Sequence, residues 1–507
     1  MDADVIIIGA GPSGLFLAGE LRTSGIRVIV LEKLLQPTGE SRGLGFTART
    51  LETFDQRGLM PRLGDVETTD LGHFGGLPVD FAVLGVPNAG GAKGIPQART
   101  EEMLGEWAAE LGADIRRGWE FTGLQDDGGG VTVEADSPAG PRRLRAAYLV
   151  GCDGGRSAVR KAAGFAFPGT ASTMEMFLGD VRGVEIKTRM IGETVPGGMV
   201  MAGPLGDGVT RIIVCERGTP PRRRTQPPAW DEVAGAWQRL TGQDIGGGTA
   251  LWLSAFGDAA RLATEYRRGR VLLVGDAAHI HLPAGGQGMN TSIQDAANLG
   301  WKLAATLRGT APEGLLDSYH EERHEIGKRL LMNTQAQGLL FLSGEEVQPL
   351  RDVMSELITH DEVSRHLAGM VSGLSIRYPA GPGDHRLLGL RAPNLELSTA
   401  GGTTTVRELL HPARGVLLDL SDDPALRVRA AGWADRVDVV TATVTAAKRP
   451  GAEDADLSGA DALLIRPDGY VAWVGGPAAP DVADALSRWF GAPAAAAAEP
   501  AGAVATA

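Results

Sequence analysis

The sequence predicts an α/β protein: a parallel sheet interrupted by an inserted antiparallel sheet and followed by long helices and a small C-terminal α/β module. Continuous apolar runs at 5–8, 148–150 and 271–274 indicate strands that are buried on both faces, as in a parallel sheet. From about 170 to 265, short apolar stretches separated by Gly and Pro indicate antiparallel strands instead. Helical spacing of apolar residues dominates from 287 to about 370.

The N-terminal third alternates strands and helices. After the first strand and a Gly-rich turn, apolar residues recur at helical spacing from Leu15 to Leu21, and Gly25 is the expected stop. A second strand is predicted at 27–32, and the three glycines at 128–130 indicate a hairpin turn before another strand.

The C-terminal part begins after a Pro- and Gly-rich linker at 379–383. Strand-like runs with helix-like segments between them then indicate a module of about 100 residues. These runs lie at 416–420, 437–441, 463–465 and 470–473. We therefore expect a discontinuous domain at 1–170 and 266–380, an inserted domain at 171–265, a module at 388–491 and a disordered Ala-rich tail at 492–507.

Composition excludes several classes of protein. The chain has 507 residues, 43% of them apolar, which is enough for buried cores in about three domains. With 49 Lys and Arg against 62 Asp and Glu, the net charge is −13 and no basic block exists, so nucleic acid and anionic membranes are not expected partners. No apolar run is long enough to cross a membrane, no signal peptide is recognised, and two cysteines cannot form a disulfide framework. We expect a cytoplasmic protein.

The Gly-rich turn predicts a dinucleotide site. Its glycines, at positions 9, 11 and 14, form G-x-G-x-x-G between a buried strand and an amphipathic helix, which is the context that this fingerprint requires. Glycine lets the backbone approach a pyrophosphate, and the helix N-terminus supplies free N–H groups. Glu32 ends the second strand, where a carboxylate can accept hydrogen bonds from ribose hydroxyls, and Lys33 follows it.

Two further motifs lie just past buried strands. Asp153 and Gly154 follow the strand at 148–150, and Asp276 follows the strand at 271–274, at the edge where α/β sheets bind ligands. The second motif continues through 283–290 into a long helix. The start of that helix can stabilise negative charge on a reduced flavin.

In this order, these motifs resemble the class A flavoprotein aromatic hydroxylases, and the resemblance covers almost the whole chain. The segments 40–46 and 286–290 and the C-terminal module also fit this family, and the chain is most similar to the angucycline oxygenases of actinobacterial aromatic polyketide pathways. The resemblance implies an FAD-binding, Rossmann-like (GR2-type) domain, an inserted antiparallel substrate sheet and a thioredoxin-like C-terminal domain. Because no cysteine follows Cys215, that last domain cannot be a dithiol oxidoreductase.

The family also implies a set of site residues. Glu32 would bind the adenosine ribose, Asp276 the ribityl chain, and Arg42, Gln97 and Arg99 would line the FAD site or its opening. Asp153 and Arg156 belong to a motif tied to both FAD and NADPH. The expected cofactor-binding residues are Gly9, Gly11, Pro12, Ser13, Gly14, Glu32, Lys33, Arg42, Gln97, Asp153, Gly154, Asp276, Pro283, Gly285, Gly286, Gly288, Met289 and Asn290. Those expected to act in catalysis are Arg42, Pro283 and Gly286.

The implied activity is hydroxylation of a polycyclic aromatic polyketide of the angucyclinone type in antibiotic biosynthesis. NADPH, as a transient co-substrate, would reduce FAD, molecular oxygen would add at the flavin, and a flavin C(4a)-hydroperoxide would deliver oxygen to a phenolic ring. No metal is expected. The oligomeric state stays open, with a homodimer as one option.

The inserted sheet is expected to form one wall of the substrate pocket, together with the loop at 283–286. Apolar strand residues alternate in direction, so some of Met199, Met201, Ile212 and Val214 should point toward the flavin. Arg211 is the exception among these largely uncharged strands. We therefore expect a neutral phenolic or quinoid polycycle, without an obligatory carboxylate.

Alternatives remain at the sequence level. A Baeyer–Villiger oxygenase would use the same residues on a polyketide ketone. His320, Glu321 and His324 match the H-E-x-x-H motif of helical zinc hydrolases, a remote alternative because the motif is short, a charged helix face explains it and the flavin motifs account for the chain. His279 or His281 could serve as a base, since histidine titrates near neutral pH, or could pack the loop.

Overall fold

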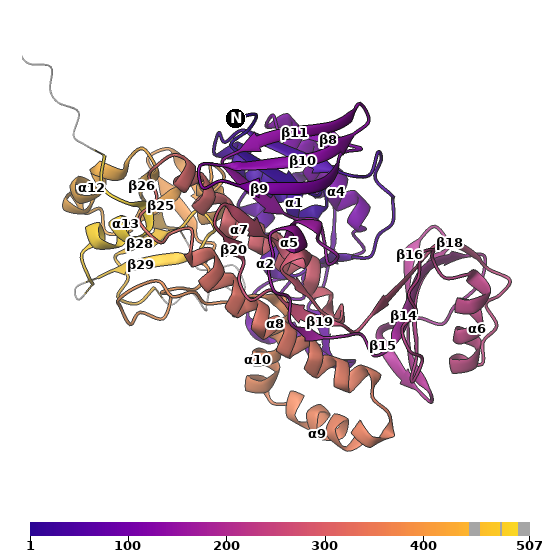
Figure 1. Cartoon of the computed structure of the whole chain (residues 1–507). Helices are drawn as coiled ribbons and strands as arrows, with labels where there is room; N and C mark the ends of the chain where they lie inside the picture. The colour runs from indigo at the N-terminus through magenta and orange to yellow at the C-terminus, as the bar shows by residue number, and fades with distance from the viewer. Residues whose placement is uncertain (446–456, 477–478, 495–507) are drawn as a thin grey trace, which may run out of the picture.

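The computed structural model describes residues 1–445, 457–476 and 479–494. Its nucleotide-binding part lies in the centre, the inserted sheet on one side and the C-terminal module on the other (Figure 1). The predicted Ala-rich tail falls outside the described residues from 495 onward. Among the described helices, none combines the length and apolarity that a membrane span requires.

A six-stranded sheet forms the central layer and positions the site. Its strand order is β20-β21-β12-β1-β2-β8, and all neighbours are parallel except β20 and β21. The carboxyl ends of β21, β12, β1 and β2 therefore meet along one edge. The strands are β1 (Val5–Ile8), β2 (Val28–Glu32), β8 (Asp114–Arg117), β12 (Tyr148–Gly151), β20 (Arg267–Arg268) and β21 (Val271–Leu273). The three predicted buried strands are confirmed.

Helices and a small meander enclose this sheet. The helices α1 (Pro12–Thr23), α4 (Gln97–Glu110) and α7 (Gln287–Leu307) pack together, with α1 in the middle. A three-stranded antiparallel sheet of β9 (Glu120–Asp126), β10 (Val131–Ser137) and β11 (Gly140–Ala146) contributes buried residues to the same core. The glycines at 128–130 form the predicted turn between β9 and β10.

The inserted region is a five-stranded antiparallel sheet with one helix on its outer face (Figure 1). The sequence predicts the sheet but misses α6 (Trp230–Thr241), a short amphipathic helix that follows a Pro- and Arg-rich loop. The strands run β15 (Arg189–Val195), β16 (Gly198–Gly206), β17 (Val209–Glu216), β14 (Glu175–Arg182) and β18 (Thr249–Gly257) across the sheet.

Short elements connect these layers. They include three further small sheets. Their strands are β3 (Gly45–Phe46), β7 (Ala92–Lys93), β4 (Glu67–Thr68), β5 (Leu71–Phe74), β6 (Leu77–Asp80), β13 (Gly169–Thr170), β19 (Ala260–Leu262) and β22 (His279–Ile280). The helices are α2 (Ala48–Asp55), α3 (Met60–Leu63), α5 (Ala158–Ala162), α8 (Ser318–Leu342), α9 (Gln348–Ile358) and α10 (Asp361–Ser372).

The C-terminal module has a thioredoxin-like order of elements. A β-α-β unit of β25 (Gly415–Asp419), α12 (Pro424–Ala430) and β26 (Val437–Thr441) is followed by the antiparallel pair β28 (Ala462–Ile465) and β29 (Val471–Gly475) and by α13 (Val482–Phe490). The sheet order is β26-β25-β28-β29. A side sheet of β23 (Glu396–Thr399), β24 (Gly402–Thr405) and β27 (Thr443–Val444), with α11 (Val406–Leu409), extends it.

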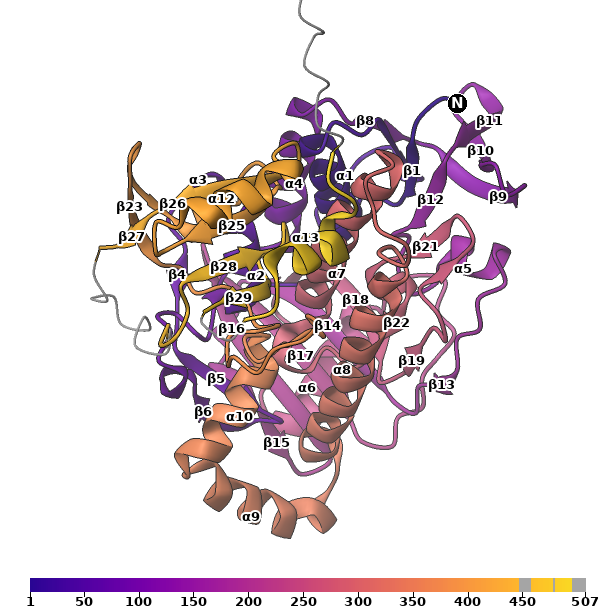
Figure 2. The same ribbon diagram turned by 90° about the vertical axis from the view of Figure 1, so that its left-hand side faces the viewer.

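The module packs directly on the long helices. Trp301 of α7 lies in one apolar cluster with Trp489 and Phe490 of α13, at ring distances of 6.4 and 6.1 Å. Figure 2 shows α13 beside α7 in the view from the module's side. The C-terminal module therefore supports α7, the helix whose start lies at the strand ends.

Candidate active site

Three glycines shape the turn between β1 and α1. Gly9 has a φ of +105°, and a Cβ there would stand 2.4 Å from the carbonyl oxygen of Cys152. A Cβ on Gly14 would stand 2.0 Å from the carbonyl oxygen of Gly9. At Gly11, in contrast, a Cβ would meet nothing within 4 Å. The outer two glycines are required by the fold, and the middle one leaves open space in front of α1.

The start of α1 is free to bind an anion. Its N-cap is Gly11, so no side chain caps the helix, and Pro12 occupies the first turn. Ser13 and Gly14 are buried behind it. Because the first N–H groups of a helix have no partner within the helix, this end can bind a phosphate.

Glu32 joins the turn to the end of β2. Its Oε2 accepts a hydrogen bond from the backbone N–H of Ala10 at 2.9 Å, and its Oε1 accepts one from Leu34 at 2.9 Å. A carboxylate has about four acceptor positions, so ribose hydroxyls can still bind to it. Lys33 is exposed beside it.

Gln97 begins α4 and holds the segment that carries Arg42. Its Oε1 accepts from the backbone N–H of Gly43 at 3.3 Å, and its Nε2 donates to Glu101 at 2.8 Å. Arg99 pairs with Glu102 on the surface at 2.6 Å. Arg99 also lines a cavity of about 710 Å³ between α1, α4 and β8. The three residues that the resemblance assigned to the opening of the site are thus neighbours.

Asp276 follows β21 at the carboxyl edge of the sheet. The protein that surrounds it raises its pKa, and His279 and Arg42 oppose this effect. Arg42 is therefore close enough to Asp276 to influence its charge, although 234 positions separate them in the chain.

Asp153 binds the first backbone N–H groups of α5, a structural role that the sequence did not predict. Its Oδ2 accepts hydrogen bonds from the backbone N–H groups of Ala158 at 2.6 Å and Val159 at 3.1 Å, at the start of α5. Its Oδ1 is buried without a partner. Gly154, with a φ of +75°, makes the turn, and Arg156 is exposed.

The loop after β22 leads into α7. Gly285 and Gly286 both have positive φ, 66° and 65°, and a Cβ on Gly286 would meet nothing within 4 Å. No side chain caps α7. Asn290 fixes the first turn: its Nδ2 donates to the carbonyl oxygen of Gly286 at 2.8 Å, and its Oδ1 accepts from the N–H of Thr47 at 2.9 Å.

This loop and the Arg42 segment touch. The methyl carbon of Met289 lies 3.2 Å from the position of a Cβ on Gly43. Gly288 borders His281 in the same way, at 3.4 Å. Arg42, Asp276 and the residues from Pro283 to Asn290 thus lie around one region in front of α7.

His279 is buried in an ionic chain. Its Nε2 lies 2.8 Å from Asp295 Oδ2, and Asp295 Oδ1 accepts from Arg323 at 2.6 Å. Burial and the neighbouring His279 lower the pKa of His281 to about 4, so His281 is neutral at physiological pH. Sequence reasoning missed Asp295 and Arg323 because an acid and an arginine on long helices carry no motif.

His320 and His324 lie next to each other on one face of α8, with ring centroids 4.7 Å apart and the ring planes tilted by 42°. The backbone N–H of Tyr266 donates to His320 Nδ1 at 3.2 Å, and the Tyr266 ring packs against both histidines. In the part of the chain that the structure describes, no three His, Cys, Asp or Glu side chains gather as metal ligands would.

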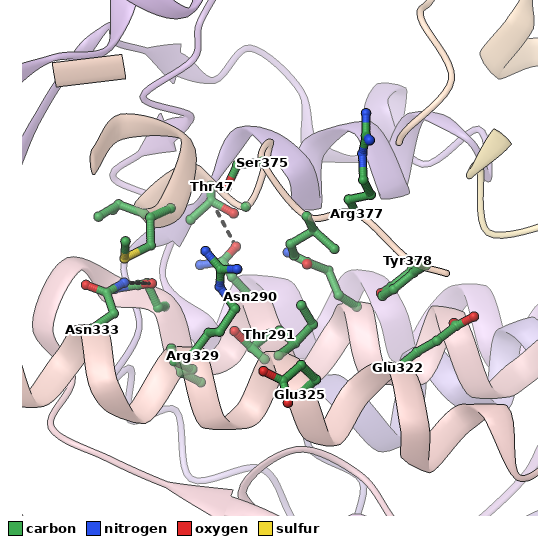
Figure 3. Close-up of a pocket in the computed structure, with 18 of the residues that line it drawn as sticks. Thr47, Asn290, Thr291, Glu322, Glu325, Arg329, Asn333, Ser375, Arg377 and Tyr378 are labelled. Atoms are coloured by element: carbon green, nitrogen blue, oxygen red, sulfur yellow. Dashed lines mark hydrogen bonds between the residues drawn. The ribbon is translucent and has the colours of Figure 1, made fainter. Parts of the chain in front are cut away.

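A second cavity, of about 280 Å³, lies between α7, α8 and α10 (Figure 3). Asn290 and Thr47 form one side of it, and Asn333, which donates to Gln287 at 2.8 Å, forms another. Arg329 and Glu325 of α8 reach toward it. Sequence reasoning did not predict this polar cavity, since its residues come from three separate helices and a linker.

The inserted sheet turns a methionine-rich face to the loop before α7. Met199 and Met201 lie in one apolar cluster with Leu282, Ala284 and Phe341. Ile212 and Val214 lie on the opposite face, against α6. Of the four residues named from the sequence, the two methionines thus face the site.

Comparisons with known proteins agree with this geometry. A family model described as an FAD binding domain matches residues 2–334, and one described as an aromatic-ring hydroxylase C-terminal domain matches 385–493. The 12-dehydrotetracycline 5-monooxygenase/anhydrotetracycline 6-monooxygenase of Streptomyces rimosus is 45% identical over 97% of this chain and all of its own. A rifampicin monooxygenase of Streptomyces venezuelae is 43% identical over 96% of this chain and 99% of its own. The crystal structure of CabE, an aromatic hydroxylase from angucycline biosynthesis, is 64% identical and superposes with a TM-score of 0.93 over 98% of this chain and all of its own.

Proposed function

Because the chain belongs to the family of FAD-dependent aromatic-ring hydroxylases, we propose that it hydroxylates a neutral polycyclic aromatic polyketide of the angucyclinone type, with NADPH as reductant and molecular oxygen as co-substrate. One observation carries the proposal. Gly11 and Gly286 each leave open the space that a side chain would fill, and each precedes a helix whose start no side chain caps.

These two helix starts fit the two charged regions of FAD. In the proposal, α1 binds the pyrophosphate, Glu32 the adenosine ribose and Asp276 the ribityl chain. The start of α7 and the Arg42 guanidinium stabilise negative charge on the isoalloxazine ring. When bound, FAD supplies the electrons and the activated oxygen for the reaction.

The protein's own residues position the ring and exclude water. The methionine-rich face and the loop at 282–284 provide an apolar wall next to the start of α7. Methionine is unbranched and adapts to a large flat ligand. A dry wall also keeps water away from the reactive oxygen.

A Baeyer–Villiger reaction on a polyketide ketone stays the second candidate, since it needs the same residues. The products distinguish the two: both gain one oxygen atom, but a hydroxylase adds a phenolic O–H and a Baeyer–Villiger enzyme inserts an ester oxygen. Product structures by NMR therefore decide between them.

The direct test uses the purified, FAD-loaded protein with NADPH, NADH and a panel of tetracyclic angucyclinones. We expect NADPH-dependent oxygen consumption coupled to a hydroxylated product that carries label from ¹⁸O₂. A correctly folded protein that cannot be loaded with FAD would overturn the whole proposal. Coupled hydroxylation of simple phenols, with none of the tetracycles turned over, would overturn the substrate class alone.

A further inference from the structure

A largely buried ion pair joins two neighbouring strands of the inserted sheet. Arg211 of β17 and Asp180 of β14 are direct partners in the antiparallel register. Arg211 Nε donates to Asp180 Oδ1 at 2.7 Å, and its Nη2 donates to Oδ2 at 2.8 Å. Both side chains are largely buried, with 7% and 10% exposed. A bidentate pair of this kind fixes the plane of the guanidinium group.

Trp252 of β18 supports the pair from the next strand. Its Nε1 donates to Asp180 Oδ2 at 2.6 Å, and the Arg211 guanidinium lies 5.2 Å from the centre of the indole ring. Asp180 thereby accepts three hydrogen bonds, and Arg211 is held from two sides. The arrangement is rigid before any ligand arrives.

The pair lies on the face of the sheet that is turned to the proposed flavin site. Alternate residues of a strand share a face, so Arg211 lies on the side of Ile213 and Cys215, while Ile212 and Val214 face α6. Ile213 and Cys215 belong to the apolar cluster that includes Leu282 from the loop before α7. Arg211 is therefore a polar group on the methionine-rich wall.

One donor of Arg211 has no partner. Nη1 is buried without a hydrogen bond, although Nε and Nη2 are both satisfied. An unpartnered buried donor of a charged group is costly, and Asp180 already accepts from Nε and Nη2 of the same guanidinium and from Trp252. A ligand that offers an acceptor here would satisfy Nη1. Because Asp180 cancels the positive charge, a neutral oxygen suits this position better than a carboxylate.

We propose that Arg211 is a specificity-determining residue, which donates a hydrogen bond from Nη1 to a neutral carbonyl, quinone or phenol oxygen of the polycyclic substrate, while Asp180 disfavours carboxylated rings. This inference rests on the function proposed above and deepens it. Trp252 is a positioning residue that holds Asp180.

A movable side chain next to the pair gives the ligand room. Gly203 of β16 is the cross-strand partner of Arg211 on the other side, and the sulfur of Met190 lies 3.0 Å from the position of a Cβ on Gly203. Met190 is 53% exposed, so its flexible side chain can move away when a ring binds. Glycine at 203 keeps this place free for it.

The test measures binding to the FAD-loaded protein with two probes, a dihydroxyanthraquinone and its monocarboxylated analogue, by quenching of protein fluorescence. Arg211→Met should weaken binding of the neutral probe by about 10- to 100-fold, as expected for loss of a hydrogen bond from a charged donor. Asp180→Asn should raise the affinity for the carboxylated probe relative to the neutral one by about 10-fold or more, because it uncovers the charge of Arg211.

Arg224→Met is the matched control. Arg224 pairs with Glu175 of β14 at 2.8 Å and lies 5.3 Å from the Phe177 ring, on the side of the sheet that faces α6. The substitution Arg224→Met should disturb the sheet as Arg211→Met does, and it should leave the affinities for both probes unchanged. FAD content and circular dichroism verify the fold of each variant. If Arg211→Met does not fold, the affinity ratio in Asp180→Asn, which is measured within one protein, still decides.

Provided that the wild type binds the neutral probe, two results would overturn the role of Arg211. One is an equal loss of probe affinity in Arg211→Met and Arg224→Met. The other is an unchanged ratio of the two probe affinities in Asp180→Asn. A wild-type protein that holds FAD but binds neither probe nor any angucyclinone would overturn the proposed substrate class, and this inference with it. Selective binding of the carboxylated probe by the wild type would contradict the inference alone.

Discussion

Glu322 is the centre of a buried ionic cluster that joins α8 to the C-terminal module. Its Oε1 accepts from Arg466 at 2.6 Å, and its Oε2 accepts from Arg466 at 2.9 Å, from Lys302 at 2.8 Å and from Asn298 at 2.6 Å. With Asp468, which also pairs with Arg466, the cluster contains two cations and two anions. The variant Glu322→Gln removes one anion from a balanced buried group.

The expected cost follows from two independent arguments. Arg466 and Lys302 hold the pKa of Glu322 at about 2, well below its ordinary value, even though burial opposes the charge. A fall from 4.5 to about 2 corresponds to about 3 kcal/mol in favour of the ionised carboxylate. Removing one partner of a buried ion pair costs about 3–5 kcal/mol in other proteins. We therefore expect the free energy of unfolding to fall by about 3 kcal/mol at pH 7.

Urea unfolding followed by tryptophan fluorescence measures this loss, because Trp301 and Trp489 lie 5.4 and 4.5 Å from the Arg466 guanidinium. Since the folded pKa lies below the unfolded one, the contribution of Glu322 is complete above pH 4.5 and disappears as the pH falls toward 2. The difference between wild type and variant should shrink over that range. Glu325→Gln, on the exposed face of the same helix, should cost less than about 0.5 kcal/mol. A loss below about 1 kcal/mol in Glu322→Gln, or one that does not depend on pH, would refute the reasoning.

Three further predictions concern the cofactor site and the cysteines. Asp276→Ala should weaken FAD retention by about 10- to 150-fold, through the loss of a charge-assisted hydrogen bond. Equilibrium dialysis measures the affinity for FAD. An unchanged affinity would mean that Asp276 does not touch FAD. Gly11→Ala should give a folded protein that binds FAD poorly, whereas Gly14→Ala should fail to fold, because only the Cβ at position 14 would collide with the chain. Thermal unfolding measures the folding of the two variants, and flavin absorbance measures their FAD content. Equal behaviour of the two variants would contradict the argument. Burial raises the pKa of Cys215 to about 12 and that of Cys152 well above its ordinary value, so both thiols are unreactive. The variant with both cysteines replaced by Ser should therefore keep NADPH-driven turnover. Loss of turnover in a folded, FAD-loaded variant would show that a thiol takes part in the reaction.

The sequence predicts the parts of this fold that depend on local patterns. Continuous apolar runs predict the buried strands. Two glycines of the first turn, Gly9 and Gly14, are required because a Cβ at either position would collide with the backbone. The order of the parallel strands then brings Glu32, Asp153 and Asp276 to one edge without further information. The helix α6 was not predicted, because one short amphipathic helix among strands gives only a weak periodic signal.

Pairings between distant elements could not be predicted. Asp180 and Arg211 are 31 positions apart, and Glu322 and Arg466 are 144 apart, and neither pair belongs to a motif. Their partners follow from strand register and from the docking of the C-terminal module, which one sequence does not encode in any local pattern. The domain boundaries expected from composition stay predictions, because the structure describes elements rather than units that fold alone.

Buried polar atoms without a hydrogen-bond partner give an argument about ligands that does not depend on any motif. Within the described residues, five buried side-chain atoms lack a hydrogen-bond partner, and a folded protein tolerates such atoms only at a cost of about 1–3 kcal/mol each. Two of them, Tyr266 Oη and Trp301 Nε1, lie in the packed interior around α8 and under the C-terminal module. The other three are Asp153 Oδ1 past β12, His279 Nδ1 past β21, and Arg211 Nη1 on the inserted sheet. Because the cluster around Glu322 shows that this chain satisfies even two buried cations where structure alone is at stake, the unpartnered donor of Arg211 supports the proposal that a ligand completes its hydrogen bonding.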